Sequence, residues 1–218
     1  MSLLTAPVLC VVLSLRLTET EGVLLLSGSV NMSDGLTEKK TSYTGVLVLY
    51  IILFAVLVAV DQIVKRVIVA NVKPLGTVVV IKNFFSLYYC ENTGSAFSLF
   101  ADKPWGIYFL SGISFVLGTG IFVLMLLSSK QGMRLISLAF CLLSSGAIGN
   151  LVDRFMFRYV VDYLRFDFGS YTFPIFNFAD ICAVLGTFLL IFIIIFKSKY
   201  FEDFWNLIFK KKEKENAV

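Results

Sequence analysis

The sequence predicts an all-α integral membrane protein with four transmembrane helices, a small extracytoplasmic β region and a C-terminal interfacial helix. Hydrophobic residues make up 58% of the 218 residues and charged residues only 16%, which is more apolar than a typical soluble domain. The apolar residues also form long runs without charge, and about 20 such residues in a helix cross a hydrocarbon core of about 30 Å. These two observations indicate a chain that crosses the membrane several times.

Residues 1–44 are expected to be an N-terminal extension that the fold does not need. The apolar stretch 3–15 is too short to span a membrane, and the polar stretch 31–42 is loop-like. Three explanations of the extension stay open: a cleaved signal, a surface segment, or a start codon assigned ahead of Met32.

The transmembrane domain is expected over residues 45–200. The run Gly106–Ser128 holds 23 residues without a charge, whereas the first run reaches spanning length only by continuing past Val60 through the charged stretch 61–70. The four expected spans are 45–70, 106–128, 135–152 and 181–196, the last with a lead-in at 176–180.

Basic residues in the short connections indicate how the spans are oriented. They precede the first span, separate the second from the third and follow the fourth, so four spans place all of them on the cytoplasmic side. Both chain ends are then cytoplasmic, and segments 72–105 and 153–175 are extracytoplasmic. Two basic residues at the outer end of the first span depart from this pattern, and we expect them to serve a site or to reach the interface. The cytoplasmic residues are Lys39, Lys40, Lys130, Arg134, Lys197, Lys199 and the run 210–214, and the two outer ones are Lys65 and Arg66.

Two further elements are expected outside the spans. Segment 76–100 is rich in β-branched and aromatic residues without a helical period, which predicts two or three short strands on the outer leaflet. Residues 201–218 form a basic tail whose apolar side chains share one helical face, typical of an interfacial helix held by aromatic residues and anionic lipid. That face consists of Phe201, Phe204, Trp205, Ile208 and Phe209.

The composition excludes several kinds of catalytic site. Histidine is absent, which removes Ser-His-Asp and Cys-His machinery and the HExxH zinc motif. The four cysteines are scattered, so neither a disulfide framework nor a zinc site is indicated. We therefore expect no metal, no cofactor and no nucleic-acid partner, and any hydrolytic chemistry must come from carboxylates, lysines or hydroxyls. The cysteines are Cys10, Cys90, Cys141 and Cys182.

Polar residues gather at the outer ends of three spans. Asp180 lies about one turn, roughly 5 Å, inside the fourth span, and Asn177 shares its helical face three residues earlier. Neighbouring polar residues on the other two spans point toward the same leaflet. They are Asn150, Asp153 and Arg154 on the third span and Asp61 and Lys65 on the first, with Asp162 in the outer loop before the fourth.

Each of these residues also has a purely structural interpretation. Asp153 and Arg154 could form an ion pair at a helix end, the i, i+4 pair Asp61–Lys65 could be structural, and Asp162 could be a solvated loop residue. Asp180 fits such an interpretation least, because a carboxylate inside a membrane span indicates a functional site.

Two carboxylates that meet in a dry site would suit peptide hydrolysis. Both cannot ionise cheaply, so one keeps its proton and can polarise a carbonyl while the other takes a proton from water. Asparagine side chains nearby could position the substrate backbone or the developing oxyanion.

Four sequence blocks, taken together, resemble the lipoprotein signal peptidases (signal peptidase II), which are bacterial membrane aspartyl endopeptidases. The resemblance covers about residues 45–197. The blocks are "DQIVK" (61–65), "ENTGSAFS" (91–98), "GAIGNLVDR" with "VVDY" (146–154 and 160–163) and "FNFAD" (176–180).

The resemblance implies that Asp162 and Asp180 form the catalytic dyad. It gives supporting roles around substrate and dyad to a further set of residues, a close-packing role to Gly146, and a structural role to Asp153. Lys65, the partner of Asp61, is grouped with the supporting residues. The remaining supporting residues are Asp61, Asn92, Asn150, Arg154 and Asn177.

The resemblance also implies a substrate and a place in the cell. The substrates would be diacylglyceryl-modified prolipoproteins, cut before the modified cysteine, and membrane lipid would surround the enzyme. We expect a monomer in the bacterial cytoplasmic membrane with its active site near the extracytoplasmic face. The chain departs from the family pattern in residues 1–44, at Ser145, and at Arg158, where the family often has glycine.

Two other functions are weaker interpretations. An ion- or proton-coupled carrier would use Asp180, Asp61 and Lys65, but a carrier needs charges near the bilayer midplane and the central thirds of spans two to four carry none. A Ser/Lys peptidase would use Lys65 as its base, but no serine stands three or four residues from Lys65 on the first span.

Overall fold

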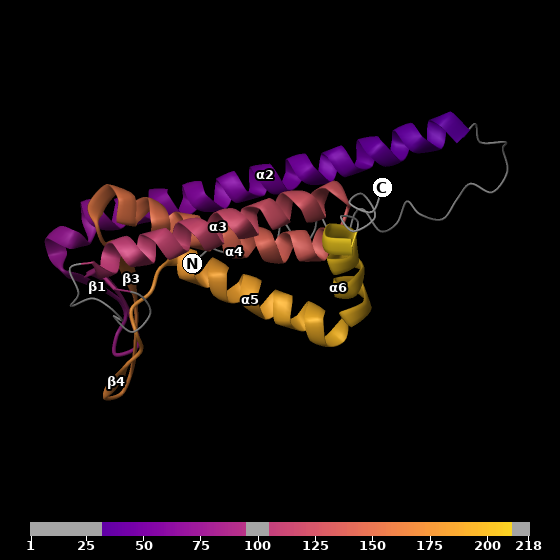
Figure 1. Ribbon diagram of the computed structural model, residues 1–218. Helices are drawn as coiled ribbons and strands as arrows, with labels where there is room; N and C mark the ends of the chain where they lie inside the picture. Colours follow the sequence, from indigo (N-terminus) through magenta and orange to yellow (C-terminus); the bar gives the residue numbers. More distant parts are fainter. Residues whose placement is uncertain (1–31, 95–104, 211–218) are drawn as a thin grey trace. The chain divides into compact units, whose positions relative to one another are not determined.

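The computed structural model describes residues 32–94 and 105–210 (Figure 1). The chain divides into two units, Met1–Lys39 and Lys40–Val218. The second unit contains all four candidate spans and every residue proposed for the site. Most of the expected N-terminal extension, residues 95–98 of one sequence block and the basic tail from residue 211 lie outside the described residues.

Four helices in the described residues are long and apolar enough to cross a membrane, which confirms the predicted number of spans. The prediction of a loop over 31–42 was wrong, because α2 is already helical from Met32. That stretch contains good helix formers such as Glu38 and Lys39 and no proline, and its glycine, Gly35, weakens a helix without ending it. The helices are α2 (Met32–Asn71), α3 (Gly106–Lys130), α4 (Arg134–Phe157) and α5 (Phe178–Phe196).

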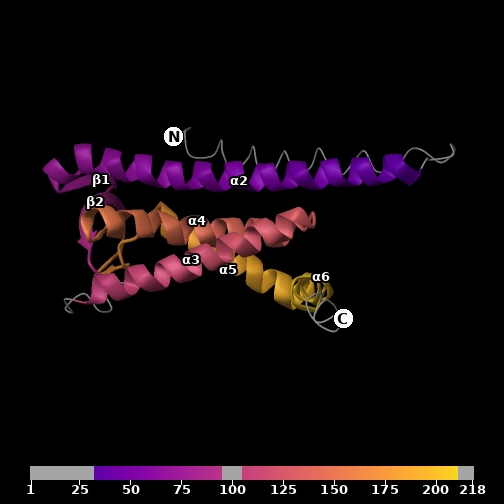
Figure 2. The ribbon, with the colours of Figure 1, turned by 45° about the horizontal axis from the view of Figure 1, so that its top comes forward.

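Helix α4 is the central helix of the unit and packs against both α3 and α5 (Figures 1 and 2). It is also joined to α2, since the Tyr50 hydroxyl donates a hydrogen bond to the Arg134 carbonyl at 2.8 Å. Small residues let the backbones approach, as expected where lipid supplies no hydrophobic driving force between helices. A Cβ atom added at Gly146 would lie 2.4 Å from the Ala179 carbonyl oxygen of α5.

Four antiparallel strands form one sheet in the order β1-β2-β3-β4. Two of them, β1 (Thr77–Ile81) and β2 (Phe85–Asn92), lie in the segment where two or three strands were predicted. The other two, β3 (Val160–Phe168) and β4 (Tyr171–Thr172), lie in a segment that was interpreted as a loop. Figure 1 shows this sheet at the end of α3 and α4 that is opposite α6.

The C-terminal part is helical as predicted, but one side chain of the expected lipid-facing surface faces the protein. Helix α6 (Ser198–Trp205) continues into a π-helical turn, Asn206–Lys210. Phe204 is buried and its ring centroid lies 5.5 Å from that of Phe140 on α4. The prediction that Phe204 contacts lipid was therefore wrong, whereas Trp205 is half exposed.

Candidate active site

The start of α5 fixes the carboxyl group of Asp180. Asn177 is the N-cap residue: its side-chain oxygen accepts a hydrogen bond from the Asp180 backbone N–H, and Asp180 Oδ2 accepts one from the Asn177 N–H, both at 3.0 Å. This reciprocal pair is a capping box, which satisfies N–H groups that have no partner inside the helix. Asp180 is thus held in the first turn, where the helix dipole favours a negative charge.

Strand β3 brings Asp162 to the same place. The backbone N–H groups of Tyr163 and Leu164 donate to the Phe176 carbonyl at 3.1 and 2.8 Å, so β3 is joined to the residue just before Asn177. Asp162 is only 3% exposed. Its interpretation as a solvated loop residue was wrong, because a paired strand buries it.

Amide side chains connect the two carboxyl groups. Asn177 Nδ2 donates to Asp162 Oδ1 at 2.6 Å and also to Asn150 Oδ1 at 3.0 Å. Asn150 Nδ2 in turn donates to Asp180 Oδ1 at 2.8 Å. From β2, Asn92 Nδ2 donates to Asp162 Oδ2 at 2.9 Å. Asp162 and Asp180 therefore belong to one hydrogen-bond network that draws on α4, α5, β2 and β3.

The environment of Asp162 favours its protonated form. Burial and the neighbouring Asp180 carboxyl raise the pKa of Asp162 to about 6, although the hydrogen bonds from Asn92 and Asn177 oppose the shift. The two effects that raise the pKa are those expected when two carboxyl groups share a site with little water.

Lys65 is a buried cation beneath this network. Its Nζ atom lies 2.9 Å from Asp61 Oδ2, 2.9 Å from Asp153 Oδ2 and 2.9 Å from Asn150 Oδ1. The predicted Asp61–Lys65 pair is confirmed, and Asp61 Oδ1 also accepts the Ala179 N–H at the start of α5. The contacts of Lys65 Nζ are thus with two carboxylates and an amide and not with a serine, so they give no support to a Ser/Lys peptidase.

Asp153 and Arg154 have different partners from those predicted. Asp153 pairs with Lys65 instead of its neighbour, and its Oδ2 accepts the Val161 N–H at 3.1 Å, which anchors β3 to α4. The i, i+1 spacing on a helix explains this, because adjacent residues do not face each other. Arg154 lies within electrostatic range of both Asp162 and Asp180.

Gln62 and Gly149 were assigned no role from the sequence, and both support the site. Gln62 Nε2 donates to the Gly149 carbonyl at 3.1 Å and to Asp153 at 3.0 Å, which joins α2 to α4. A Cβ at Gly149 would lie 2.7 Å from Asp61 Oδ2, so this glycine lets Asp61 approach α4. The signal for Gln62 was its polar side chain next to Asp61, in a stretch expected to span the membrane.

Within the described residues, no three histidine, cysteine, aspartate or glutamate side chains form a group that could hold a metal ion. The groups that face one another are carboxyls, amides, a lysine and an arginine. Such a set can bind a peptide backbone through its amides and can exchange protons through its carboxyls.

The comparisons with known proteins agree on one family. Residues 53–196, more than half of the chain, match the family model described as signal peptidase (SPase) II. A lipoprotein signal peptidase of Clostridium tetani is 46% identical over 129 residues, which is 58% of this chain and 78% of the relative. A lipoprotein signal peptidase of Clostridium acetobutylicum is 35% identical over 149 residues, which is 68% of this chain and 94% of the relative.

The fold agrees with the family match. A solved structure described as a bacterial membrane enzyme has a TM-score of 0.58 and 27% identity, and the match covers 69% of this chain and 89% of that one. The family match and the four candidate spans lead to one conclusion: the chain is a multi-pass membrane protein that belongs to the signal peptidase II family of proteases.

Proposed function

We propose that this chain removes signal peptides from prolipoproteins by cutting before a diacylglyceryl-modified cysteine, with Asp162 and Asp180 as the catalytic pair. The observation that carries the proposal is the shared network in which Asn177 and Asn150 connect the two carboxyl groups. The relatives named lipoprotein signal peptidase support the same activity.

The proposed chemistry is hydrolysis of a peptide bond, in which the oxygen of one water molecule goes to the carbonyl carbon and a proton goes to the leaving amine. The ionised carboxyl takes a proton from water as the water oxygen attacks the peptide carbonyl carbon, and the protonated carboxyl gives its proton to the carbonyl oxygen. When the tetrahedral intermediate collapses, the C–N bond breaks and a proton passes to the leaving amine. The raised pKa of Asp162 supports this residue as the one that holds the proton before attack.

The supporting residues have separate tasks in this proposal. Asn92, Asn150 and Asn177 orient the carboxyls, and their amides are suited to hold the substrate backbone. Asp61 and Lys65 fix the start of α5 against α2 and α4. Gly146 lets α4 approach α5 closely enough for Asn150 to reach Asp180.

We place the active site near the extracytoplasmic face and both chain ends in the cytoplasm, in the bacterial cytoplasmic membrane. The basic residues of the connections support this orientation, because Lys130 and Arg134 lie at the ends of α3 and α4 remote from Asp180. A monomer fits the proposal, since all groups of the site come from one chain.

A comparison of two substrate forms tests the proposed substrate. The acyl chains of a diacylglyceryl group supply about 0.8 kcal/mol for each buried methylene, and such remote binding energy can hold the scissile peptide at the carboxyls. We expect the purified chain to cut the unmodified precursor far more slowly than the diacylglyceryl form, with initial rates read from the mobility shift and the new N-terminus identified by mass spectrometry. Equal rates would show that the peptide alone is recognised, and no cleavage of either form would contradict the activity itself.

A further inference from the structure

Helix α4 ends on an arginine in a backbone conformation that favours glycine. Arg158 is its C-cap residue, with a φ angle of 67° in the left-handed region. This conformation is unfavourable for residues with a Cβ atom, and glycine adopts it freely. Glycine would end the helix at a lower conformational cost. The arginine side chain, however, makes a contact that glycine could not make.

The Arg158 side chain is directed across to helix α3. Its Nη1 atom donates a hydrogen bond to the Tyr108 hydroxyl, and its guanidinium carbon lies 5.1 Å from the centre of the Tyr108 ring. Arg158 and Tyr108 are both exposed, and the guanidinium lies over the Tyr108 ring in a cation–π contact.

The two residues border a groove of about 390 Å³ between α3 and the end of α4, called here the α3–α4 groove. Its walls include the apolar side chains of Ile107, Phe115 and Phe155, and its lining also includes Arg154, one turn before Arg158. Among the described residues that line the groove, two are arginines and none is acidic. The groove is thus apolar along its walls and cationic at one end.

Arg154 has hydrogen-bonding capacity left over. Within the described residues, its buried Nε atom has no hydrogen-bond partner. Its terminal nitrogens reach Ser114 Oγ and the Gly94 carbonyl only at 3.4 Å each, at the long end of the range for hydrogen bonds. A guanidinium placed in this way can accept an anion without losing a strong existing contact.

The groove lies at the expected level of the lipid headgroups. It is formed where α3 begins and α4 ends, and these two helix ends carry exposed aromatic side chains, as is typical of a membrane–water interface. These side chains are Trp105, Tyr108, Phe109 and Phe155.

We propose that the α3–α4 groove binds an anionic glycerophospholipid, with its phosphodiester on Arg158 and Arg154 and one acyl chain along the apolar walls. Arginine suits this ligand because its planar fork matches phosphate oxygens in a bidentate manner. The site lies beside the catalytic network and shares Arg154 with the residues around it, and the proposal rests on the placement of the chain in a membrane.

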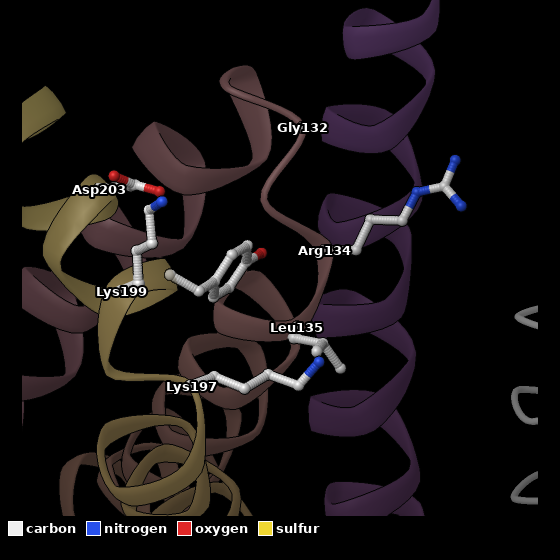
Figure 3. Close-up of a pocket in the computed structure, with 7 residues that line it drawn as sticks. Gly132, Arg134, Leu135, Lys197, Lys199 and Asp203 are labelled. Carbon is white, nitrogen blue, oxygen red and sulfur yellow. The ribbon is translucent and has the colours of Figure 1, made fainter.

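A second basic hollow, at the opposite ends of α4 and α5, supplies a matched control (Figure 3). Lys199 lines it together with Asp203, and in Figure 3 these two side chains lie next to each other while Arg134 extends away from them. Lys199 is thus a cation that lines a hollow near the other membrane face, where its removal should leave the α3–α4 groove intact.

Lipid binding to the full chain in detergent tests the proposal, with phosphatidylglycerol, phosphatidylcholine and inorganic phosphate as probes and native mass spectrometry as readout. We expect phosphatidylglycerol to bind more tightly than phosphatidylcholine, and Arg158→Gly to weaken phosphatidylglycerol binding about tenfold. Lys199→Gln should bind it like the unaltered chain. Arg158→Gly should keep or raise the melting temperature, because glycine relieves the left-handed conformation.

A second variant fills the groove and leaves both arginines in place. A Cβ at Gly112 meets no atom within 4 Å, so Gly112→Leu is expected to fold and to weaken phosphatidylglycerol binding as well. Unchanged binding in Arg158→Gly or in Gly112→Leu would overturn the proposal. Equal binding of the two lipids, or binding of inorganic phosphate as tight as that of phosphatidylglycerol, would also overturn it.

Discussion

Within the described residues, the side chains that donate hydrogen bonds to the carboxyl groups of Asp162 and Asp180 are amides and not cations. This choice has an electrostatic consequence. A lysine or arginine in direct contact would stabilise both carboxylates in their ionised form, whereas an amide donates a hydrogen bond without adding a charge. Lys65 donates its hydrogen bond to Asn150 and not to either carboxyl group, and its charge lowers the pKa of Asp162 less than burial and Asp180 raise it. The pKa of Asp162 is therefore raised to about 6, which favours the protonated form that the proposed chemistry requires more than an ordinary aspartate would.

The hydrogen bond from Asn92 gives a prediction for the pH dependence of cleavage. This bond stabilises the ionised form of Asp162 and so lowers its pKa, which burial and Asp180 have raised to about 6. In Asn92→Ala the pKa should rise further. If Asp162 must be protonated, activity is lost as the pH rises through that pKa, so the basic limb of kcat/KM should move to higher pH. A limb that stays in place, or moves to lower pH, would remove Asp162 from the role of proton donor.

At the residue scale, the sequence predicted local relationships well and non-local ones poorly. Asn177 and Asp180 were expected on one helical face, and the capping box joins them. The partner of Asp153 was mistaken, because Lys65 comes from another helix and no local spacing reveals it. The burial of Asp162 was missed for the same reason, since it depends on the pairing of β3 with β2, about 70 residues earlier in the chain.

At the scale of helices, the contact between α4 and α5 sets the distance between Asn150 and Asp180. Gly146 lies at that contact, one turn before Asn150, and a Cβ there would meet the Ala179 carbonyl oxygen at 2.4 Å and the Ala183 nitrogen at 3.0 Å. These are backbone atoms, which cannot move aside as a flexible side chain can.

Gly146→Ala should therefore lower both stability and activity. Overpacking of this kind typically costs about 1–3 kcal/mol, and it should separate Asn150 from Asp180. Thermal unfolding in detergent and initial cleavage rates measure the two effects. Gly120→Ala on α3 is the control, because a Cβ there meets nothing within 4 Å. A Gly146→Ala variant as stable and active as Gly120→Ala would show that the close approach is not needed.

The spans could be predicted because length and hydropathy are local properties of the chain. The helices α3 and α5 begin and end within three residues of the expected limits, whereas α4 continues to Phe157, five residues past the end of the expected span at residue 152. The charged residues Asp153 and Arg154 ended the predicted span, yet Asp153 has its partners inside the protein. Strand β3 was missed because a connection between two spans was expected to be a loop.

At the scale of the whole molecule, the absence of histidine from the sequence leads to a prediction about metals. The proposed hydrolysis uses carboxyls alone, so cleavage should survive chelators such as EDTA and reagents directed at serine. Restoration by a divalent ion, after loss of activity in EDTA, would contradict the aspartyl assignment.

Cys90 is paired directly opposite Asp162 in the sheet, so thiol reagents need a Cys90→Ser control to separate steric blockage from catalysis.

The central claim is that Asp162 and Asp180 together perform the cleavage, and the rates of two single variants test it most directly. Asp162→Asn and Asp180→Asn keep the shape of each side chain but supply neither a base nor an acidic proton. With a diacylglyceryl prolipoprotein as substrate, each purified variant should insert into membranes and fold like the unaltered chain while its cleavage rate falls to background. Substantial turnover by either variant, shown to be folded, would contradict the claim for that residue.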